Sequence, residues 1–402
     1  MTLTLLLDLD DTLLDNNIDA FLPQYLSAFS NFVADKVPPD RFVSTLLLGT
    51  RAMVKNRRPD CTLREVFESN FFPVLDLDAA EFQDIADQFY KQIFPTLRTH
   101  TRFRPEAVEM VQEFLRRGYR VAIATNPLFP RMAIEHRLSW AGLPVDQYPF
   151  ELVTSYESFH FTKPDTAYFG EVMARLGWPD GPVLVVGDDL ANDISPARRL
   201  GLAAFWVGKD GLPSSAQDGP TASGNLSDIL RWIDSQPSGE MQTDFTSPEA
   251  MLAILRSTPA AMDGMLRGLA VPAWTRQPFA GEWSLVEVIC HLRDVDQEVN
   301  LERVRKVVDE TNPFIPGKDT DPWAVERGYN QQNGEQALQE FTATRLKLLD
   351  LLENLPAEGW RRPARHAIFG PTLLSELVNI IASHDRLHIQ QIYTLIKAIS
   401  ST

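Results

Sequence analysis

An apolar strand that runs directly into a group of carboxylates is the feature that most constrains this chain. Residues 5–14 read LLLDLDDTLL, so Asp8, Asp10 and Asp11 follow a buried-strand pattern within four positions. Carboxylates this close repel one another and raise one another's pKa. A nearby cation relieves that repulsion, and a divalent metal ion is the obvious candidate. The segment therefore predicts a cation site at the end of a buried strand.

Length and composition are those of a soluble globular protein. A chain of 402 residues exceeds one ordinary core, so we expect two domains. The net charge of −16 argues against nucleic acid and anionic membranes as partners, because both favour a basic surface. Cys61 and Cys290 fall in different expected domains and suggest no disulfide framework, which fits a reducing cytoplasm. We find neither a signal peptide nor an apolar run long enough to span a membrane.

Short apolar runs alternate with helical patterns through the first half of the chain. Strands that alternate with helices predict a parallel α/β sheet. Residues 16–100 show helical patterns without a clear strand, as expected for an inserted helical cap. The runs of strand length are 3–7, 120–124, 183–186 and 203–207.

The second half of the chain has a different character. Residues 237–247 are rich in loop-forming residues and are the predicted linker between a domain at 1–236 and one at 248–402. Long amphipathic helices without a strand signal follow, and four of this length predict a four-helix bundle. The predicted helices are 248–268, 284–309, 333–354 and 372–398.

Polar residues follow three of the predicted strands and precede one predicted helix in the first half. Ligands of an open α/β sheet bind outside the carboxyl ends of its strands, so we expect these residues to form one site. Its members are Asp8, Asp10, Thr125, Asn126, Lys163, Asp188 and Asp193.

This set of residue types suits phosphoryl transfer. The Asp8 carboxylate can attack phosphorus and form an aspartyl-phosphate. A Mg²⁺ ion held by Asp8 and Asp188 would neutralise the two approaching anions. Lys163 and Thr125 can hold the phosphoryl oxygens, and Asp10 can protonate the leaving oxygen and then activate water.

Simpler interpretations compete with this one. Aspartates also end strands and cap helices, but that explains one segment and not four in this order. Basic residues in the predicted cap could contact a second anionic group of a substrate. We favour a solvated helix face for them. They are Arg51, Lys55, Arg57 and Arg58.

The sequences DLDDT (8–12) and GDDLAND (187–193), with Thr125 and Lys163 between them, resemble the four ordered motifs of the haloacid dehalogenase superfamily. The resemblance covers about residues 1–236 and implies a Rossmann-like sheet with a helical cap. It implies a nucleophile at Asp8, an acid and base at Asp10, and phosphoryl contacts from Thr125 and Lys163. Asn126 is a further candidate for substrate binding.

The same resemblance implies Mg²⁺ on Asp8, the backbone carbonyl of Asp10, and Asp188. Asp193 would support the metal or orient Lys163. Dehalogenases of the superfamily lack the second aspartate, so Asp10 points to phosphate esters. A phosphomutase or phosphotransferase that uses the same Asp8 is an alternative.

Histidines carry the chemistry predicted for the second half. His384 and His388 are four residues apart and share one helix face. His291 lies beside the apolar stripe of another helix, which begins with the capping-box pattern Ser284-x-x-Glu287. Three imidazoles leave positions open on a reactive Zn²⁺, Ni²⁺, Fe²⁺ or Cu²⁺ ion. The alternative is a set of histidines that only satisfy hydrogen bonds.

Three further residues are expected near these histidines. We expect Asp294 and Asp385 to orient the imidazoles and His366 to lie at the surface or at the rim of the site.

Trp283-Ser284, HLRD at 291–294 and HDRLHIQQI at 384–392 resemble the DinB-like family of metal-binding four-helix bundles. The resemblance covers about residues 248–402 and implies a divalent transition metal, Zn²⁺, Ni²⁺ or Fe²⁺, on the three histidines. Many members are dimers, so a homodimer through the bundle is expected, and some are thiol-dependent transferases.

The sequence as a whole predicts a cytoplasmic Mg²⁺-dependent phosphohydrolase for a small phosphorylated metabolite, fused to a three-histidine metal-binding bundle. One alternative places the main activity, a thiol-dependent metallotransferase, in the bundle. Another makes the bundle a dimerisation or sensing module.

Overall fold

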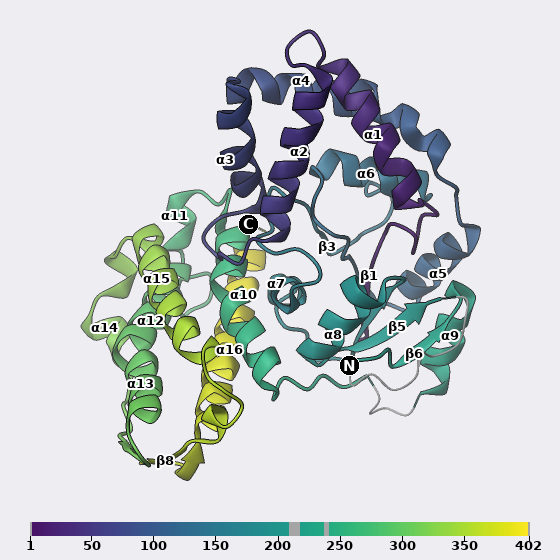
Figure 1. Ribbon diagram of the computed structural model, residues 1–402. Helices are drawn as coiled ribbons and strands as arrows, with labels where there is room; N and C mark the ends of the chain where they lie inside the picture. Colours follow the sequence, from purple (N-terminus) through teal and green to yellow (C-terminus); the bar gives the residue numbers. More distant parts are fainter. Residues whose placement is uncertain (1, 209–217, 237–240, 401–402) are drawn as a thin grey trace. The chain divides into compact units, whose positions relative to one another are not determined.

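The computed structural model describes residues 2–208, 218–236 and 241–400 of the chain (Figure 1). It divides into two compact units, one of residues 1–168 and 179–244 and the other of residues 169–178 and 245–402. Part of the predicted linker, 237–240, lies outside the described residues, and 241–247 contain neither helix nor strand. The domain limits at 236 and 248 therefore stay predictions.

A parallel sheet forms the centre of the first unit (Figure 1). Within the described residues it has six strands in the order β3-β2-β1-β4-β5-β6, which confirms the predicted Rossmann-like α/β fold. β3 and β6 were not predicted, because runs of two or three residues carry no readable pattern. The strands are β1 (Thr4–Leu7), β2 (Arg120–Ile123), β3 (Leu152–Val153), β4 (Val183–Gly187), β5 (Ala203–Val207) and β6 (Ala222–Gly224).

The sheet is buried because its strands are apolar on both faces. Leu5, Leu6 and Leu7 of β1 are fully buried although their side chains alternate between faces. A sheet of this kind needs helices on both sides, and the chain supplies one after nearly every strand. Within this unit these helices are α5 (Pro105–Arg116), α6 (Arg131–Trp140), α8 (Ser195–Leu200) and α9 (Leu226–Ser235), and α7 (Thr166–Arg175) falls on the division between the two units.

The stretch between β1 and α5 is helical, as the sequence predicts for a cap. Buried aromatic rings hold these helices together, with Phe29 and Phe89 stacked at 4.0 Å between ring centroids. The elements are α1 (Ile18–Phe32), α2 (Pro39–Val54), α3 (Leu63–Leu75), α4 (Ala79–Gln92) and the 3₁₀ helix η1 (Phe94–His100).

Long helices form the second unit and confirm the predicted bundle. The capping box is also confirmed: Ser284 Oγ accepts from the Glu287 backbone N–H, and the Glu287 carboxylate accepts from Ser284 N–H at 2.7 Å. The helix predicted over 284–309 is interrupted by one π-helical turn. The elements are α10 (Pro248–Leu266), α12 (Leu285–Val295), η3 (Asp296–Asn300), α13 (Leu301–Asp309), α15 (Gly334–Glu353) and α16 (Leu374–Ser400).

The second unit is not entirely helical, so the expectation of no strand after residue 248 is wrong. A three-stranded sheet joins β7 (Phe314–Ile315), β8 (Pro363–His366) and β9 (Gly370–Leu373). Gly370 takes a φ of 74° at the start of β9, a conformation that glycine adopts without strain. These strands are too short for an alternating pattern to show. Short helical elements connect the rest: α11 (Val271–Trp274), α14 (Trp323–Glu326), η4 (Tyr329–Gln331) and η5 (Gly359–Arg361).

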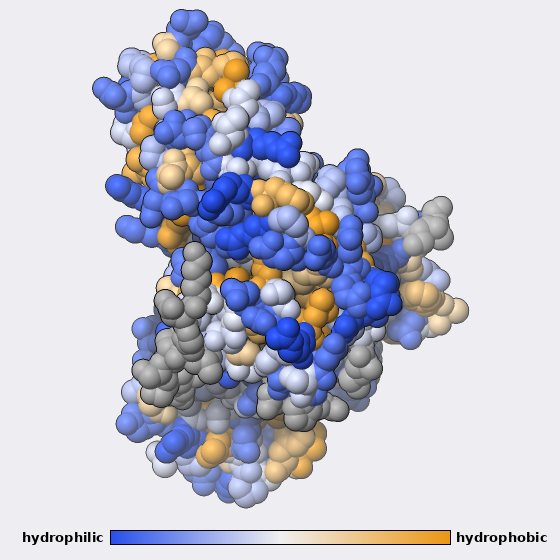
Figure 2. All heavy atoms as spheres, turned by 90° about the vertical axis from the view of Figure 1, so that its right-hand side faces the viewer, coloured by the Kyte–Doolittle hydropathy of each residue, from blue (hydrophilic) through white to orange (hydrophobic). Residues whose placement is uncertain are grey.

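Hydrophilic residues cover most of the face drawn in Figure 2, with smaller hydrophobic groups between them. The large hydrophobic side chains lie mainly in the cores of the two units. Among the described residues, no helix combines the length and the hydropathy needed to cross a bilayer.

Candidate functional site

The strand order changes direction between β1 and β4, because β2 and β3 lie on one side of this pair and β5 and β6 on the other. An aspartate directly follows each of these two strands. Leu7 of β1 is in register with Ile123 of β2 and Val186 of β4, so Asp8, Thr125 and Asp188 emerge at the same edge. In open α/β sheets, ligands bind in the crevice at such a reversal. The topology therefore brings the predicted residues to one place.

Lys163 joins two of the predicted carboxylates in the interior. Its side chain is 2% exposed, and its Nζ donates to Asp8 Oδ1 at 2.7 Å and to Asp193 Oδ1 at 2.5 Å. A Cβ at Gly187 would lie 2.3 Å from Asp193 Oδ2, so only glycine leaves room for Asp193 here. Asp193 thus holds Lys163 against Asp8, one of the two arrangements that we predicted.

Asp8, Asp188 and Asp193 could hold a metal ion, since each offers a carboxylate oxygen and these oxygens lie within 4.8 Å of one another. The side chain of Asp188 also accepts from Thr12 Oγ1 at 3.1 Å, and its backbone oxygen accepts from Trp206 Nε1 at 2.7 Å. The three carboxylates and Lys163 leave two negative charges, which one divalent cation would balance. The site therefore fits a Mg²⁺ ion.

The pKa values show the same shortage of positive charge. Burial raises the pKa of Asp8 well above its ordinary value, against the attraction of Lys163 and with repulsion from Asp193 and Asp188. Burial and the neighbouring Asp193 raise the pKa of Asp188 to about 7. For Lys163, burial lowers the pKa, but the adjacent Asp193 and Asp8 outweigh it and raise the pKa. Carboxylates with raised pKa values are typical of sites completed by a cation.

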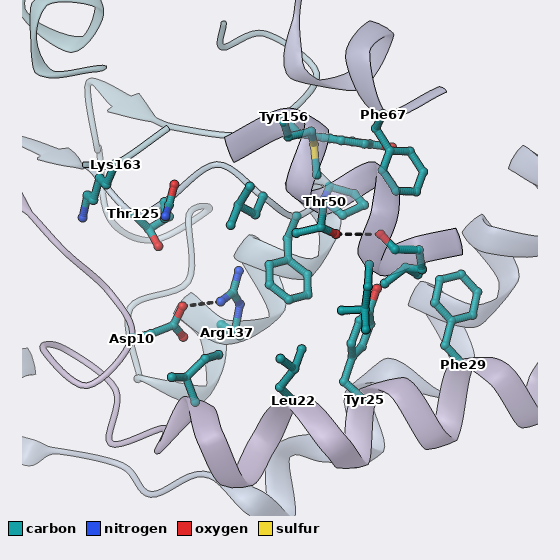
Figure 3. A pocket seen from close by; sticks show the side chains of 18 of the residues that line it. Asp10, Leu22, Tyr25, Phe29, Thr50, Phe67, Thr125, Arg137, Tyr156 and Lys163 are labelled. Carbon is teal, nitrogen blue, oxygen red and sulfur yellow. Dashed lines mark hydrogen bonds and ion pairs between the residues drawn. The ribbon is translucent and has the colours of Figure 1, made fainter. Parts of the chain in front are cut away.

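Asp10 lies beside this group and is held by two side chains. Its carboxylate accepts from Asn16 Nδ2 at 2.8 Å and forms an ion pair with Arg137 of α6 (Figure 3). The Arg137 guanidinium is almost fully buried and lies 4.5 Å from the centre of the Phe129 ring. Asp10 is thereby fixed two residues beyond Asp8.

The predicted substrate contacts also line the cavity beside Asp8. Thr125 is 1% exposed, and its backbone oxygen accepts from Thr154 Oγ1 at 2.6 Å and from the Tyr168 hydroxyl at 2.8 Å. Among the described residues, the buried Oδ1 of Asn126 has no hydrogen-bond partner. Figure 3 shows Thr125 and Lys163 next to each other along the wall of the cavity. Their positions suit a bound oxyanion.

Asp11 and Asp189 have local structural roles. Asp11 adopts a φ of 57°, and its carboxylate accepts from Asn16 N–H at 3.2 Å, which closes the turn after β1. Asp189 caps the π-helical turn η2 (Leu190–Ile194) by accepting from the backbone N–H groups of Ala191 and Asn192.

The basic residues of the cap do not line the cavity. All four are exposed to solvent, as expected, but only Arg51 lies on a helix, because α2 (Pro39–Val54) ends before the other three. Met53, on the same helix as Arg51, lines the cavity instead. The four are Arg51, Lys55, Arg57 and Arg58.

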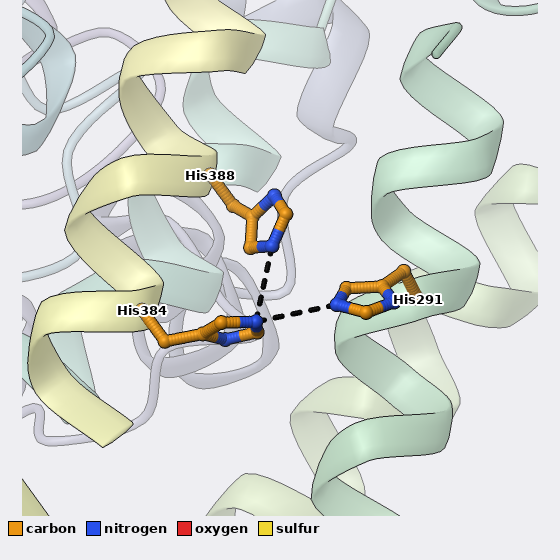
Figure 4. A group of neighbouring side chains, drawn as sticks. All are labelled: His291, His384 and His388. Carbon is orange, nitrogen blue, oxygen red and sulfur yellow. Dashed lines mark hydrogen bonds between the residues drawn. The ribbon is translucent and has the colours of Figure 1, made fainter. Parts of the chain in front are cut away.

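Three imidazoles converge in the second unit (Figure 4). His384 Nε2 lies 3.2 Å from His291 Nε2 and 3.1 Å from His388 Nε2. Ligands about 2.1 Å from a shared metal ion in tetrahedral or octahedral geometry are separated by about 3.0–3.4 Å. The three nitrogens therefore have the spacing of a facial metal site.

Gln391 fixes the proton of one imidazole. His388 Nδ1 lies 3.0 Å from Gln391 Oε1, which can only accept, so Nδ1 carries the proton and Nε2 presents its lone pair to the other histidines. Burial, followed by the neighbouring histidines, lowers the pKa of His291 to about 3, and burial with His384 lowers that of His388 to about 4. Neutral imidazoles are the form that binds metal.

The aspartates expected to orient these histidines are engaged elsewhere, so that prediction is wrong. Asp385 pairs with the buried Arg345. Asp294 pairs with Arg293 and Arg327, and it accepts from Tyr329.

Trp283 and His366 occupy the surroundings of the histidine site. The Trp283 ring lies parallel to the His388 ring, with centroids 6.0 Å apart, and also contacts His291. His366 is 4% exposed, so its expected surface position is wrong. It lines a small cavity together with His384, which agrees with a place at the rim of the site.

Comparison with known proteins matches two families to different parts of the chain. The haloacid dehalogenase-like hydrolase model matches residues 2–201, and the DinB superfamily model matches residues 254–392. Residues 2–201, called the hydrolase domain below, belong to the haloacid dehalogenase-like hydrolases, and residues 254–392, called the DinB domain, belong to the DinB superfamily. Both predicted resemblances are confirmed.

Individual relatives match parts of the chain. The uncharacterized protein YuaE of Bacillus subtilis is 27% identical over 138 residues, which are 31% of this chain and 85% of YuaE. The phosphoserine phosphatase of Thermus thermophilus is 28% identical over 138 residues, which are 34% of this chain and about half (51%) of that enzyme. The structure of 2-haloacid dehalogenase from Pseudomonas syringae is 24% identical, covers 58% of this chain and 99% of its own, and gives a TM-score of 0.42.

Two residues of these domains were missed by the sequence analysis. In the hydrolase domain, Arg137 lies 127 positions from Asp10, and the sequence around it looks like an ordinary helix. In the DinB domain, Gln391 lies three residues after His388, a spacing that places both on one helix face. That spacing is a signal that could have identified Gln391.

Proposed function

We propose that the hydrolase domain is a Mg²⁺-dependent phosphomonoesterase with Asp8 as its nucleophile. The observation that carries this proposal is the meeting of Asp8, Lys163 and Asp188 at the sheet reversal, with Asp10 fixed beside them. The phosphoserine phosphatase among the relatives supports the same class of reaction.

Each of these residues has a separate role in the proposed reaction. The Asp8 carboxylate attacks phosphorus, the bond to the leaving oxygen breaks, and Asp10 in its protonated form gives that oxygen a proton and becomes a carboxylate. Water then attacks the aspartyl-phosphate, with Asp10 taking a proton from it. Lys163 and Thr125 stabilise the charge on the phosphoryl oxygens. Arg137 and Asn16 hold the Asp10 side chain in place and favour the carboxylate that takes the proton from water in the second step.

The metal ion would be held by Asp8 and Asp188, with Asp193 beside them. When bound, Mg²⁺ supplies the positive charge that lets an anionic carboxylate approach an anionic phosphate. The two uncompensated negative charges of the site leave a place for it.

Phosphate release is the first expected result. The protein should release inorganic phosphate from p-nitrophenyl phosphate with Mg²⁺, and excess EDTA should lower the rate about 10²-fold or more, because the carboxylates would then repel the substrate. Added Mg²⁺ should restore the rate. Absence of phosphate release from a broad panel of monoesters would contradict the proposal, and isomerised sugar phosphate without free phosphate would indicate a mutase.

We further propose that the DinB domain holds a divalent transition metal on His291, His384 and His388. The convergence of His291 Nε2 and His388 Nε2 on His384 Nε2 supports this, because three neutral imidazoles that carry their protons on Nδ1 would direct their lone pairs toward one ion. A metal ion bound there would have open positions for a ligand such as a thiolate, which is the basis of the alternative transferase activity.

Substitution of His384 should remove that metal. His384 contacts both other histidines, so His384→Ala is expected to reduce the metal content of the full-length protein from about one equivalent to almost none. Elemental analysis after dialysis measures this. His366→Asn, which can still accept from the Ile368 and Phe369 amides, is the matched control and should keep its metal. A full equivalent of metal on His384→Ala would rule out this site.

A further inference from the structure

The cavity beside Asp8 extends into the cap of the hydrolase domain, where it is apolar. It has a volume of about 340 Å³ and reaches from the catalytic carboxylates to all four cap helices. Its polar end holds Asp8 together with Asp10, Lys163 and Arg137, and Figure 3 shows the last three. Aromatic rings line much of the remainder, among them Tyr25, Phe29, Phe67, Phe71, Phe82 and Phe129.

Close helix packing brings these rings to the cavity. A Cβ at Gly49 of α2 would lie 2.7 Å from the Phe67 ring of α3, so the missing side chain makes room for that ring. The Phe67 and Phe71 rings stack at 4.9 Å between centroids. The aromatic wall is therefore built into the packing of the cap.

The polar groups that the cap contributes to the cavity already have partners. The Tyr25 and Tyr90 hydroxyls bond to each other at 2.8 Å, and Thr50 Oγ1 donates to a backbone oxygen of its own helix. Glu68 and Gln83 both accept from Arg64. A sugar hydroxyl that entered this end would exchange its bonds to water for contacts with aromatic rings and with groups that are mostly hydrogen-bonded already, which is costly.

The size of the cavity sets the scale of the group that fits. A dry cavity of about 150 Å³ is enough to hold benzene. The present volume therefore accommodates a phosphoryl group together with a ring or a chain of comparable size. An aromatic lining favours a group with a large apolar surface.

We infer that the hydrolase domain acts on phosphomonoesters whose alcohol is a bulky apolar group. This inference rests on the proposed phosphomonoesterase activity. The phosphoryl group lies against Lys163 and Thr125, and the apolar group lies among the rings of α1, α3 and α4. Sugar phosphates and phosphoserine are poor substrates because their hydroxyl, amino or carboxylate groups would lose bonds to water against a mostly aromatic lining.

Esters of matched reactivity test the inference. We would compare 3-phenylpropyl phosphate with glucose 6-phosphate and phosphoserine, since all three leave as primary alkoxides. The expected kcat/KM is about 10²-fold or more higher for 3-phenylpropyl phosphate. Calorimetric binding of 3-phenylpropyl phosphonate gives a second readout that does not depend on turnover.

A matched pair of variants on α4 tests the location. Ala86 lines the cavity, whereas Ala80 on the same helix is exposed. Ala86→Trp should lower kcat/KM for 3-phenylpropyl phosphate about tenfold or more and leave ethyl phosphate nearly unchanged, because only the larger group needs the filled space. Ala80→Trp should change neither, and a thermal melt of both variants checks their folding.

Several outcomes would overturn the inference while leaving the proposed activity in place: a preference for glucose 6-phosphate or phosphoserine, or an equal loss for large and small esters in Ala86→Trp. If no ester is hydrolysed, the proposed activity fails. In that case, tight binding of the phosphonate to wild type and weaker binding to Ala86→Trp would still support an apolar ligand in this cavity. Absence of phosphonate binding would overturn the inference of an apolar ligand.

Discussion

Replacing Asp8 by asparagine is expected to lower phosphate release by about 10⁴-fold or more, because an amide cannot act as the nucleophile. Asp8 is 8% exposed and is held by Lys163 at 2.7 Å at the edge of the sheet. Asparagine has nearly the same shape, so the variant should still fold. Steady-state phosphate release with saturating Mg²⁺ measures the effect.

Asp15→Asn is the matched control for this substitution. Asp15 belongs to the same segment, but its carboxylate pairs with Arg102, whose side chain is 82% exposed. Loss of such an exposed pair costs little, so activity should stay within about twofold of wild type. If Asp8→Asn kept activity comparable to Asp15→Asn, Asp8 could not be the nucleophile.

Replacing Arg345 by methionine is expected to destabilise the DinB domain by about 3–5 kcal/mol. Arg345 is fully buried and donates to Asp296 at 2.7 Å, to Asp385 at 3.0 Å and to Leu255 O at 3.1 Å. Both aspartates are also buried, so the variant leaves two facing carboxylates without a cation. That loss corresponds to a decrease of about 1–3 M in the urea midpoint.

Hydrogen exchange at increasing urea can measure this effect by domain. Peptides from α15 and α16 should lose protection at lower urea, while peptides from β1 in the hydrolase domain serve as an internal reference. Arg365→Met, at an exposed position, should leave the midpoint unchanged.

A triple variant gives a second check. Because an apolar replacement of a whole buried ion cluster is often tolerated, Arg345→Met with Asp296→Leu and Asp385→Leu should be more stable than Arg345→Met alone. Equal midpoints for Arg345→Met and wild type would contradict this account.

The sheet and the N-terminal site could be predicted because their signals are local. Each catalytic candidate lies within three residues of the end of a strand or the start of a helix, and Asp8 and Asp188 directly follow Leu7 and Gly187. The parallel sheet then places the carboxyl ends of its strands side by side. The residues lie far apart in the sequence, but the topology alone brings them together.

Arg137 and the apolar cavity could not be predicted, because they depend on packing between distant elements. Nothing in the sequence of α6 indicates that Arg137 reaches Asp10. The rings of the cavity come from several cap helices, and whether an aromatic residue lines a cavity or fills a core depends on how those helices meet. Gly49 against Phe67 is such a contact.

In the histidine site, residues that are adjacent in sequence point in different directions because they lie on a helix. Asp385 is adjacent to His384, but successive side chains on a helix point about 100° apart, so Asp385 faces Arg345 instead. Gln391 is three residues from His388 and shares its face. The periodicity that placed His384 and His388 together therefore also favoured Gln391 over Asp385.

The most direct test of the central claim is to look for the phosphorylated nucleophile. The protein would be mixed with Mg²⁺ and 3-phenylpropyl phosphate or p-nitrophenyl phosphate, quenched in acid during turnover, and digested for mass spectrometry. We predict one phosphoryl group on the peptide that contains Asp8, labile to hydroxylamine and absent from Asp8→Asn. Rapid phosphate release without any phosphorylated Asp8 peptide would contradict the account.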